Sequence, residues 1–213
     1  MGAAGKRKKV LMTGAAGYIA SHAALEFMQE GWDVIGIDNL SVGMRQSVPD
    51  GVEFHELDCR SPEVVELARS HNIEVAVHFA GRIRVDESVA FPYIYYDTNV
   101  AAASAFFDLA TKAGVKGLVF SSTAAVYEAG NDGPVEESHP TVPVSPYGRS
   151  KLSAEWALHD LCQASETRHV TLRYFNVAGA DAQLRTGPRH GAHHLISAVS
   201  EAAIGLRDRL EIF

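Results

Sequence analysis

The sequence of 213 residues has only two cysteines, Cys59 and Cys162, and no apolar run long enough to span a membrane. Two distant cysteines form neither a disulfide framework nor a metal-binding pattern, which indicates a reducing, cytoplasmic setting. Basic residues are also in the minority, since 19 Lys and Arg stand against 26 Asp and Glu and leave a net charge of −7. This acidic balance argues against nucleic acid or an anionic membrane as a partner.

Internal repeats, low-complexity linkers and a signal-peptide core are absent as well. Residues 1–9 carry a basic cluster, and we expect them to be a disordered lead-in. His190, His193 and His194 are close in sequence, but no acid or cysteine completes a zinc set, so no metal site is predicted.

What the chain does contain is an alternation of apolar strands and helices. The predicted strands are residues 10–13, 32–38, 53–58, 74–79, 116–122 and 169–174, and the predicted helices begin near residues 19, 61, 93 and 146. Ser61 is expected to cap the second helix, and the third is expected to run unbroken from Tyr93 to Lys112. Strands that are apolar nearly throughout and separated by helices predict an α/β fold with a parallel sheet covered on both faces.

The first strand ends in a glycine turn, Gly14-Ala15-Ala16-Gly17, and a helix follows. Gly14 allows the tight turn, and Gly17 lets the backbone approach a pyrophosphate at the helix start. The second strand ends in Asp38, about 20 residues on, at the spacing of a carboxylate that binds the adenosine ribose. That carboxylate also repels a 2′-phosphate, so the pattern predicts NAD rather than NADP. An ordinary strand-to-helix turn followed by a loop acid is the alternative.

These features predict a Rossmann-type, doubly wound domain over residues 10–190. Ligands of such sheets bind beyond the carboxyl ends of the strands, so the loops 39–51, 80–92 and 123–146 are expected to surround the cofactor. Asp58 ends the third strand and is expected to face the adenine. Phe79, Ala80 and Gly81 follow the fourth strand, and their small members permit a close approach of the cofactor.

Hydroxyl and cationic side chains gather after the fifth strand and on the helix that begins at residue 146. Tyr147 and Lys151 are four residues apart and therefore share one helix face. A nearby ammonium favours phenolate, so Lys151 is expected to lower the pKa of Tyr147. Tyr147 would then take a proton from a sugar hydroxyl while hydride passes to NAD, and Thr123 would relay the proton. A surface helix pair is the alternative for an isolated Tyr–Lys spacing.

The segments TGAAGYIASH, IDNL, HFAG, DESV, YYDTNV, FSSTAAVY, SPYGRSK and RYFNVAGA resemble the extended short-chain dehydrogenase/reductase superfamily, and within it the UDP-galactose (UDP-glucose) 4-epimerase family. The resemblance implies NAD-dependent epimerisation of a UDP-hexose through a 4-keto sugar, by a cytoplasmic homodimer. It implies Tyr147 as base, Lys151 as its partner on the ribose, and Thr123 as the relay. A dehydratase needs an acid pair after Thr123, and Ala124-Ala125 lack it.

The residues that the resemblance places at each ligand form two sets. The cofactor-binding set is Gly14, Gly17, Tyr18, Ile19, Asp38, Asn39, Asp58, Cys59, Phe79, Ala80, Gly81, Asn99, Ser121, Ser122, Tyr147, Lys151 and Tyr174, with Glu87 and Ser88 lining the pocket or its rim. The substrate set is Thr123, Tyr147, Asn176 at the diphosphate, and His194 and Leu195 at the nucleotide. Ile83 replaces a lysine that these epimerases often carry near the cofactor.

Two expectations concern the end of the chain and its assembly. Residues 191–213 are expected to begin a substrate-binding region that is truncated, so that the chain alone binds sugar nucleotide poorly. The alanines at 101–103 and 105, with Trp156, Leu158 and Leu161, are expected either to pack on the sheet or to form a helical interface with a second subunit. A related sugar-nucleotide epimerase or decarboxylase and a non-catalytic NAD-binding regulatory protein are the alternative functions.

Overall fold

The computed structural model describes residues 7–128, 130, 133–188 and 195–209. The chain consists of two compact units, one over residues 1–175 and one over residues 176–213. Among the described residues, no helix is both long enough and apolar enough to cross a membrane.

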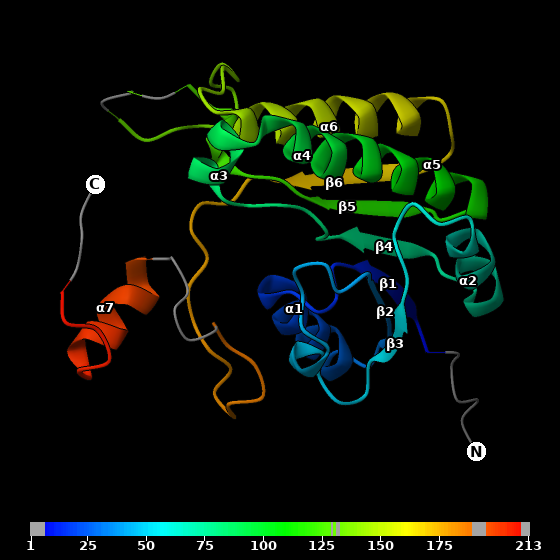
Figure 1. Ribbon diagram of the computed structural model, residues 1–213. Helices are drawn as coiled ribbons and strands as arrows, with labels where there is room; N and C mark the ends of the chain where they lie inside the picture. Colours follow the sequence, from blue (N-terminus) through cyan, green and yellow to red (C-terminus); the bar gives the residue numbers. More distant parts are fainter. Residues whose placement is uncertain (1–6, 129, 131–132, 189–194, 210–213) are drawn as a thin grey trace. The chain divides into compact units, whose positions relative to one another are not determined.

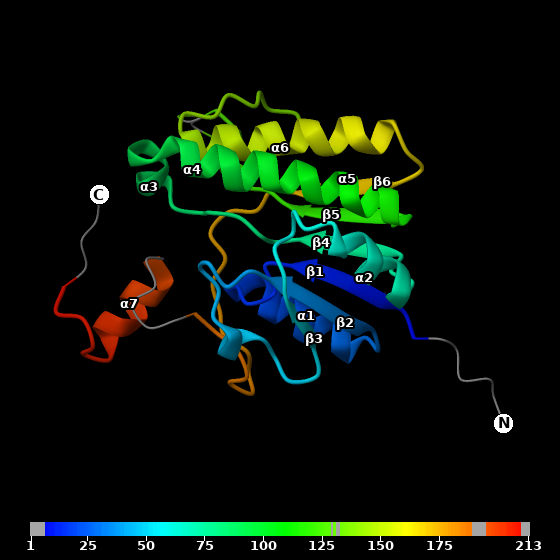
Figure 2. The same ribbon diagram turned by 45° about the vertical axis from the view of Figure 1, so that its right-hand side comes forward.

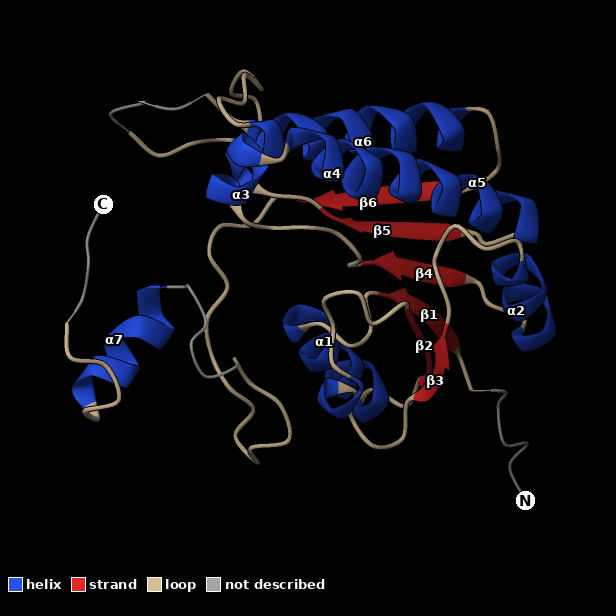
Figure 3. Cartoon of the chain, in the orientation of Figure 1, coloured by secondary structure: helices blue, strands red, loops and turns tan. Residues whose placement is uncertain are grey.

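The first unit is built on a sheet of six parallel strands, β1 (Lys9–Thr13), β2 (Asp33–Asp38), β3 (Glu53–Glu56), β4 (Val75–His78), β5 (Gly117–Ser121) and β6 (Arg168–Leu172) (Figure 3). Their order is β3-β2-β1-β4-β5-β6. This is the order of doubly wound dinucleotide-binding sheets, in which the direction of strand addition reverses between β1 and β4. The predicted fold class is confirmed.

The helices of this unit are α1 (Tyr18–Gln29), α2 (Glu63–His71), α3 (Val85–Ala90), α4 (Pro92–Tyr96), α5 (Ala103–Ala113) and α6 (Pro146–Gln163). Two 3₁₀ turns, η1 (Arg45–Ser47) and η3 (Ala124–Val126), and a π-helical segment, η2 (Asp97–Ala102), complete it. In both Figure 1 and Figure 2, α5 and α6 lie side by side over one face of the sheet, and α1 covers the opposite face.

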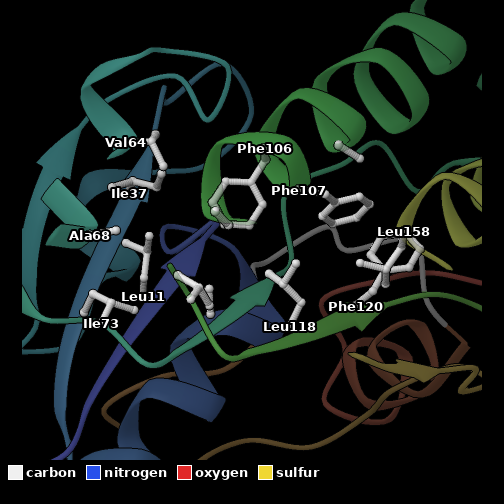
Figure 4. Packing of buried hydrophobic residues seen from close by; sticks show 14 of the residues in the cluster. Leu11, Ile37, Val64, Ala68, Ile73, Phe106, Phe107, Leu118, Phe120 and Leu158 are labelled. Atoms are coloured by element: carbon white, nitrogen blue, oxygen red, sulfur yellow. The ribbon is translucent and has the colours of Figure 1, made fainter. Parts of the chain in front are cut away.

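Alternation along the strands produces a core on each face. On β1, Leu11 points into the layer beneath α2, α5 and α6, whereas Val10 and Met12 point toward α1. Figure 4 shows the larger layer, in which Phe107 of α5 meets Phe120 of β5 with ring centroids 5.5 Å apart. Leu158 of α6 is fully buried in this layer, so it packs on the sheet and is not available to a subunit interface.

Local signals start and stop the helices. Ser145 caps α6 by accepting a hydrogen bond from the Gly148 N–H at 3.0 Å, and Pro146 occupies the first turn. Gly114 ends α5 at a φ of 90°. The expectation for Ser61 is wrong, because Pro62 takes the cap position of α2 without a side-chain cap bond and the Ser61 hydroxyl donates to Glu63.

The helix expected over residues 93–112 is interrupted. The chain passes from α4 through the π-helical segment η2 into α5, and Asn99 lies in that segment. Asn99 is buried and hydrogen-bonds the backbone of Arg82 through both its oxygen and its nitrogen. A wider turn at this point lets the Asn99 side chain face a distant loop, which helical periodicity does not reveal.

The second unit carries α7 (Leu195–Ala203) and, before it, a turn held by the Arg185–Asp181 ion pair at 2.6 Å. His190, His193 and His194 lie outside the described residues, as does the apolar end at residues 210–213.

Candidate cofactor and catalytic site

The glycine turn after β1 meets the end of β4 at the point where the strand order reverses. Gly14 has a φ of +68°, and a Cβ there would lie 2.6 Å from the backbone nitrogen of Ala80. Only glycine fits this contact. Gly17 caps α1 with no side-chain cap bond, and its N–H donates to the Gly14 carbonyl at 2.9 Å. Tyr18 and Ile19 open the helix. No side chain caps the start of α1, and uncapped helix starts can bind phosphate groups through their backbone N–H groups.

A buried polar contact ties the two strand ends together. Thr13 Oγ1 accepts the Ala80 N–H at 3.2 Å and forms a hydrogen bond of 2.7 Å with His78 Nδ1. The His78 ring stacks on Phe106 at 5.0 Å, and burial lowers its pKa to about 3, so the imidazole is neutral. This contact fixes Phe79 and Ala80 against the glycine turn, and sequence reasoning missed it.

The acids expected at the adenosine half lie along the next strand ends. The Asp38 carboxylate accepts the N–H groups of Ala16 at 3.1 Å and Leu40 at 2.8 Å, so it shapes the glycine turn and the following loop together. Asn39 donates to Asp58 at 2.9 Å. Hydrogen bonds from Arg60 lower the pKa of Asp58 to about 2, which keeps this carboxylate charged. Burial raises the pKa of the neighbouring Cys59 to about 12, which keeps its thiol neutral.

Asn99 and Gly81 lie close together after β4, on the side of α6. Asn99 Nδ2 donates to Ser150 Oγ on α6 at 3.1 Å, in addition to its contacts with Arg82. A Cβ on Gly81 would lie 3.0 Å from Asn99 Oδ1 and 3.6 Å from Lys151 Nζ. Gly81 therefore lets the loop after β4 approach both the π-helical segment and α6.

Tyr147 and Lys151 lie on the buried face of α6, and Thr123 is hydrogen-bonded to Tyr147. Their side chains are nearly buried, with exposed fractions of 9%, 3% and 9%. The Lys151 ammonium lies 4.6 Å from the centroid of the Phe120 ring, and no described residue gives it a hydrogen bond or an ion pair. Burial lowers the pKa of Lys151 to about 8, although the charge of Glu155 opposes the shift. A buried cation without a direct polar partner is costly and is typical of a ligand-binding position.

The expected acidification of Tyr147 is wrong for the protein's own groups. Burial raises the pKa of this phenol, the hydrogen bond with Thr123 lowers it, and Tyr174 raises it. Desolvation is the largest cause, and Lys151 is not among the groups that shift this pKa. The phenolate form of Tyr147 is therefore less populated at neutral pH than the spacing to Lys151 predicts.

A second aromatic residue supports Tyr147. Tyr95 of α4 is fully buried and meets Tyr147 edge-on at 6.3 Å. Its hydroxyl donates to Glu87 at 2.7 Å, and Ser88 beside it is also buried. Glu87 thus reaches the site through Tyr95, while Ile83 is 70% exposed.

Serine residues at the end of β5 contact the segment after β6. Ser121 shares a hydrogen bond with the Tyr174 hydroxyl, and Ser122 donates to Glu155 of α6. Their contacts with a cofactor stay predictions. Asn176 and Leu195 belong to the second unit, where both are exposed, and His194 lies outside the described residues.

Among the described residues, no group of three or more His, Cys, Asp or Glu side chains is arranged to hold a metal ion. The strand order, the glycine turn at the reversal point, Asp38 after β2 and the Tyr147–Lys151 pair define a dinucleotide-dependent protein of the short-chain dehydrogenase/reductase type.

Residues 10–211 match the NAD dependent epimerase/dehydratase family, and the chain belongs to this family. It is 44% identical over 207 residues to the UDP-glucose 4-epimerase of Azospirillum brasilense, with 96% of this chain and 60% of that protein covered. It is 40% identical over 206 residues to the enzyme of that name from Halalkalibacterium halodurans, with 96% and 61% covered. The chain thus spans about three fifths of the length of these relatives.

Solved structures similar to this chain carry the same name. UDP-glucose 4-epimerase from Brucella ovis in complex with NAD superimposes with a TM-score of 0.91 at 36% identity, covering 97% of this chain and 64% of that one. The Stenotrophomonas maltophilia UDP-glucose 4-epimerase, solved with NAD and formylated UDP-arabinopyranose, gives the same TM-score and identity, and 97% and 65% are covered.

Proposed function

We propose that the protein catalyses NAD-dependent epimerisation at C4 of a UDP-hexose, interconverting UDP-galactose and UDP-glucose. The observation that carries this proposal is the nearly buried Lys151 ammonium, one helical turn after Tyr147 and beside Gly81, with no hydrogen-bond partner among the described residues. Relatives named UDP-glucose 4-epimerase, and neighbours solved with NAD and a UDP-sugar, support it.

Residues at the carboxyl ends of the strands suit NAD from its adenine to its second ribose. The start of α1 suits the pyrophosphate, Asp38 the adenosine ribose, and Asp58 the adenine. Lys151 suits the hydroxyls of the second ribose, because an ammonium donates hydrogen bonds that hydroxyl oxygens accept. NAD would accept hydride from C4 and return it to either face of the sugar.

The chain's own residues supply the proton chemistry. Tyr147 accepts the proton of the C4 hydroxyl, and Thr123, hydrogen-bonded to Tyr147, holds the same oxygen and relays the proton. Lys151 stays charged at neutral pH and orients the ribose. Asn176, His194 and Leu195 are proposed to bind the diphosphate and nucleotide of the substrate, and weak sugar-nucleotide binding by residues 1–213 remains our prediction.

The test is incubation of the NAD-loaded chain with UDP-galactose, whose concentration is raised until the rate saturates. NADH absorbance and the formation of UDP-glucose are followed. We expect transient NADH and formation of UDP-glucose. A Tyr147→Phe variant should keep its NAD yet turn over about 10²–10⁴-fold more slowly. The matched control is Tyr93→Phe, at a tyrosine that is 79% exposed. Full activity in Tyr147→Phe would remove this residue as the base, and absence of any UDP-sugar conversion by the wild-type chain would overturn the proposed function.

We also propose that the protein is a cytoplasmic homodimer that uses the outer faces of the π-helical segment, α5 and α6. Trp156 on α6 is 60% exposed and Ala101 is exposed, whereas Ala102 and Ala103 pack in the core. A large exposed aromatic beside small residues suits helix–helix packing. The free thiols of Cys59 and Cys162 suit a reducing compartment.

A further inference from the structure

Glu155 is the third member of a series on α6. Tyr147, Lys151 and Glu155 follow one another at intervals of four residues and all lie on the buried face of the helix. Glu155 is 7% exposed, although no step of the proposed reaction uses a carboxylate there. A carboxylate is rarely buried without a specific set of partners.

The partners of Glu155 come from separate parts of the chain. Ser122, directly after β5, donates its hydroxyl to Glu155. Arg173, directly after β6, donates Nε to both carboxylate oxygens at 3.1 Å and Nη2 to one of them at 2.6 Å. Arg173 also donates to the Tyr127 hydroxyl at 3.1 Å, and its guanidinium lies 5.0 Å from the Tyr127 ring centroid. The Glu155 carboxylate therefore holds the ends of two adjacent strands against α6.

Thr123 is held from both sides by this arrangement. On one side of it, Ser122 is fixed by Glu155 through its side chain and by Leu172 through its backbone N–H at 2.9 Å. On the other side, the Ala124 N–H donates to the Tyr174 carbonyl at 3.0 Å. The Thr123 hydroxyl accepts the Ala125 N–H at 3.1 Å and is hydrogen-bonded to Tyr147.

We propose that Glu155 is a positioning residue for the proton-transfer step: through Ser122 it holds the Thr123 hydroxyl against Tyr147, and it provides a fixed negative charge on the Lys151 face of α6. The proposal rests on the proposed function. It assigns Glu155 no contact with substrate or cofactor. The ion pair with Arg173 orients Glu155, because the guanidinium donates hydrogen bonds to both carboxylate oxygens.

The test compares Glu155→Gln, Ser122→Ala and the double variant, each loaded with NAD. Gln keeps the shape of the side chain and removes its charge, while Ser122→Ala removes only the donor and leaves the Glu155–Arg173 pair intact. We expect kcat for UDP-galactose to fall about 10- to 100-fold in each single variant, with KM and bound NAD within about twofold of wild type. The double variant should be no slower than the slower single variant, because Glu155→Gln replaces the carboxylate acceptor of the Ser122 hydroxyl with a weaker amide oxygen, and Ser122→Ala removes the donor of that same contact.

A second readout does not depend on activity. Hydrogen exchange of the Ala124 and Ala125 amides, which report the position of the Thr123 turn, should speed up in both single variants. The matched control is Glu166→Gln, at a glutamate whose side chain is 93% exposed, and it should change neither readout.

The outcomes separate the two proposals. Unchanged exchange together with unchanged kcat in Ser122→Ala and Glu155→Gln would overturn the positioning role. Less bound NAD, a higher KM and lower thermal stability, with additive effects in the double variant, would show that the ion pair is merely structural. That result would also overturn the positioning role. If the wild-type chain converts no UDP-sugar, the epimerase function is refuted. Faster exchange in the two single variants would then still support the Glu155–Ser122–Thr123 linkage.

Discussion

Replacing Lys151 with Met should stabilise the chain while it weakens the binding of NAD that we propose for Lys151. Lys151 is 3% exposed and its ammonium has no hydrogen-bond or ion-pair partner among the described residues. Met has nearly the same length and needs no polar partner, so it fills the same space. The substitution thus removes a buried charge and little packing.

The expected gain follows from the pKa of Lys151, which burial lowers from 10.5 to about 8. Each pKa unit corresponds to about 1.4 kcal/mol, so holding this charge costs the folded state about 3 kcal/mol at pH 7. Loss of the contact between the ammonium and the Phe120 ring reduces this expected gain in stability by about 0.5–1 kcal/mol. We therefore expect Lys151→Met to raise the free energy of unfolding by about 2 kcal/mol at pH 7.

The sign of the pH dependence is fixed by the direction of the shift. Between pH 8 and 10.5 the unfolded wild-type chain binds the Lys151 proton and the folded chain does not, so wild-type stability rises relative to that of the variant across this window. The advantage of Lys151→Met is therefore full below pH 8 and is lost by about pH 10.5.

The assay is urea denaturation of NAD-free protein at several pH values, with Lys116→Met as the control. Lys116 has 66% side-chain exposure, and its substitution should change stability little at any of these pH values. NAD at a hundredfold excess over Kd should raise the free energy of unfolding of wild type by about 2.7 kcal/mol. The same NAD concentration should stabilise Lys151→Met by less. A Met variant that is less stable than wild type at pH 7, or an advantage that persists unchanged to pH 10.5, would refute the reasoning.

Other substitutions test the cofactor crevice and the assembly. Gly14→Ala should lower the unfolding free energy by about 1–3 kcal/mol and abolish NAD binding in calorimetry, since its Cβ would lie 2.6 Å from the Ala80 nitrogen; unchanged affinity would contradict the turn assignment. Asp38→Asn should weaken NAD binding and narrow the preference for NAD over NADP, and titrations that show the same preference as wild type would exclude its ribose role. Trp156→Glu should shift the chain to monomer in light scattering. The control is Val142→Glu, at an apolar side chain that is 52% exposed outside the helices, and it should leave the oligomeric state unchanged. If Trp156→Glu is still a dimer, the interface lies elsewhere.

The fold and much of the crevice were predictable because their signals are local. A glycine turn between an apolar strand and a helix defines its own backbone geometry, and Gly14 and Gly17 occur where that geometry needs them. Tyr147 and Lys151 share a helix face because of their spacing alone. The carboxyl ends of parallel strands meet at one edge, which is why the sequence places Asp38 beside the glycine turn.

The features that could not be predicted from the sequence depend on contacts between distant segments. Asn99 breaks the helical pattern because it bonds Arg82, and His78 is neutral because it is surrounded by aromatic rings from α5 and β5. Glu155 finds Arg173 only after β6 is placed beside β5. The pKa of Tyr147 has the opposite direction from the one expected, because burial, which spacing does not report, outweighs its polar contacts.

Burial drives both members of the Tyr147–Lys151 pair toward their neutral forms, since it raises the pKa of the phenol and lowers that of the ammonium. The proposed proton transfer needs the opposite forms, a phenolate and an ammonium. A ligand that brings positive charge to Tyr147 and hydroxyl oxygens to Lys151 would shift both groups back. Oxidised NAD has both features, a cationic ring and ribose hydroxyls, whereas the ring of reduced NAD is neutral. The protonation state of Tyr147 is therefore coupled to the oxidation state of the cofactor: with oxidised NAD bound, the lowered pKa would make the proton-accepting phenolate more abundant, and with reduced NAD bound, the higher pKa would favour the phenol, which can donate a proton.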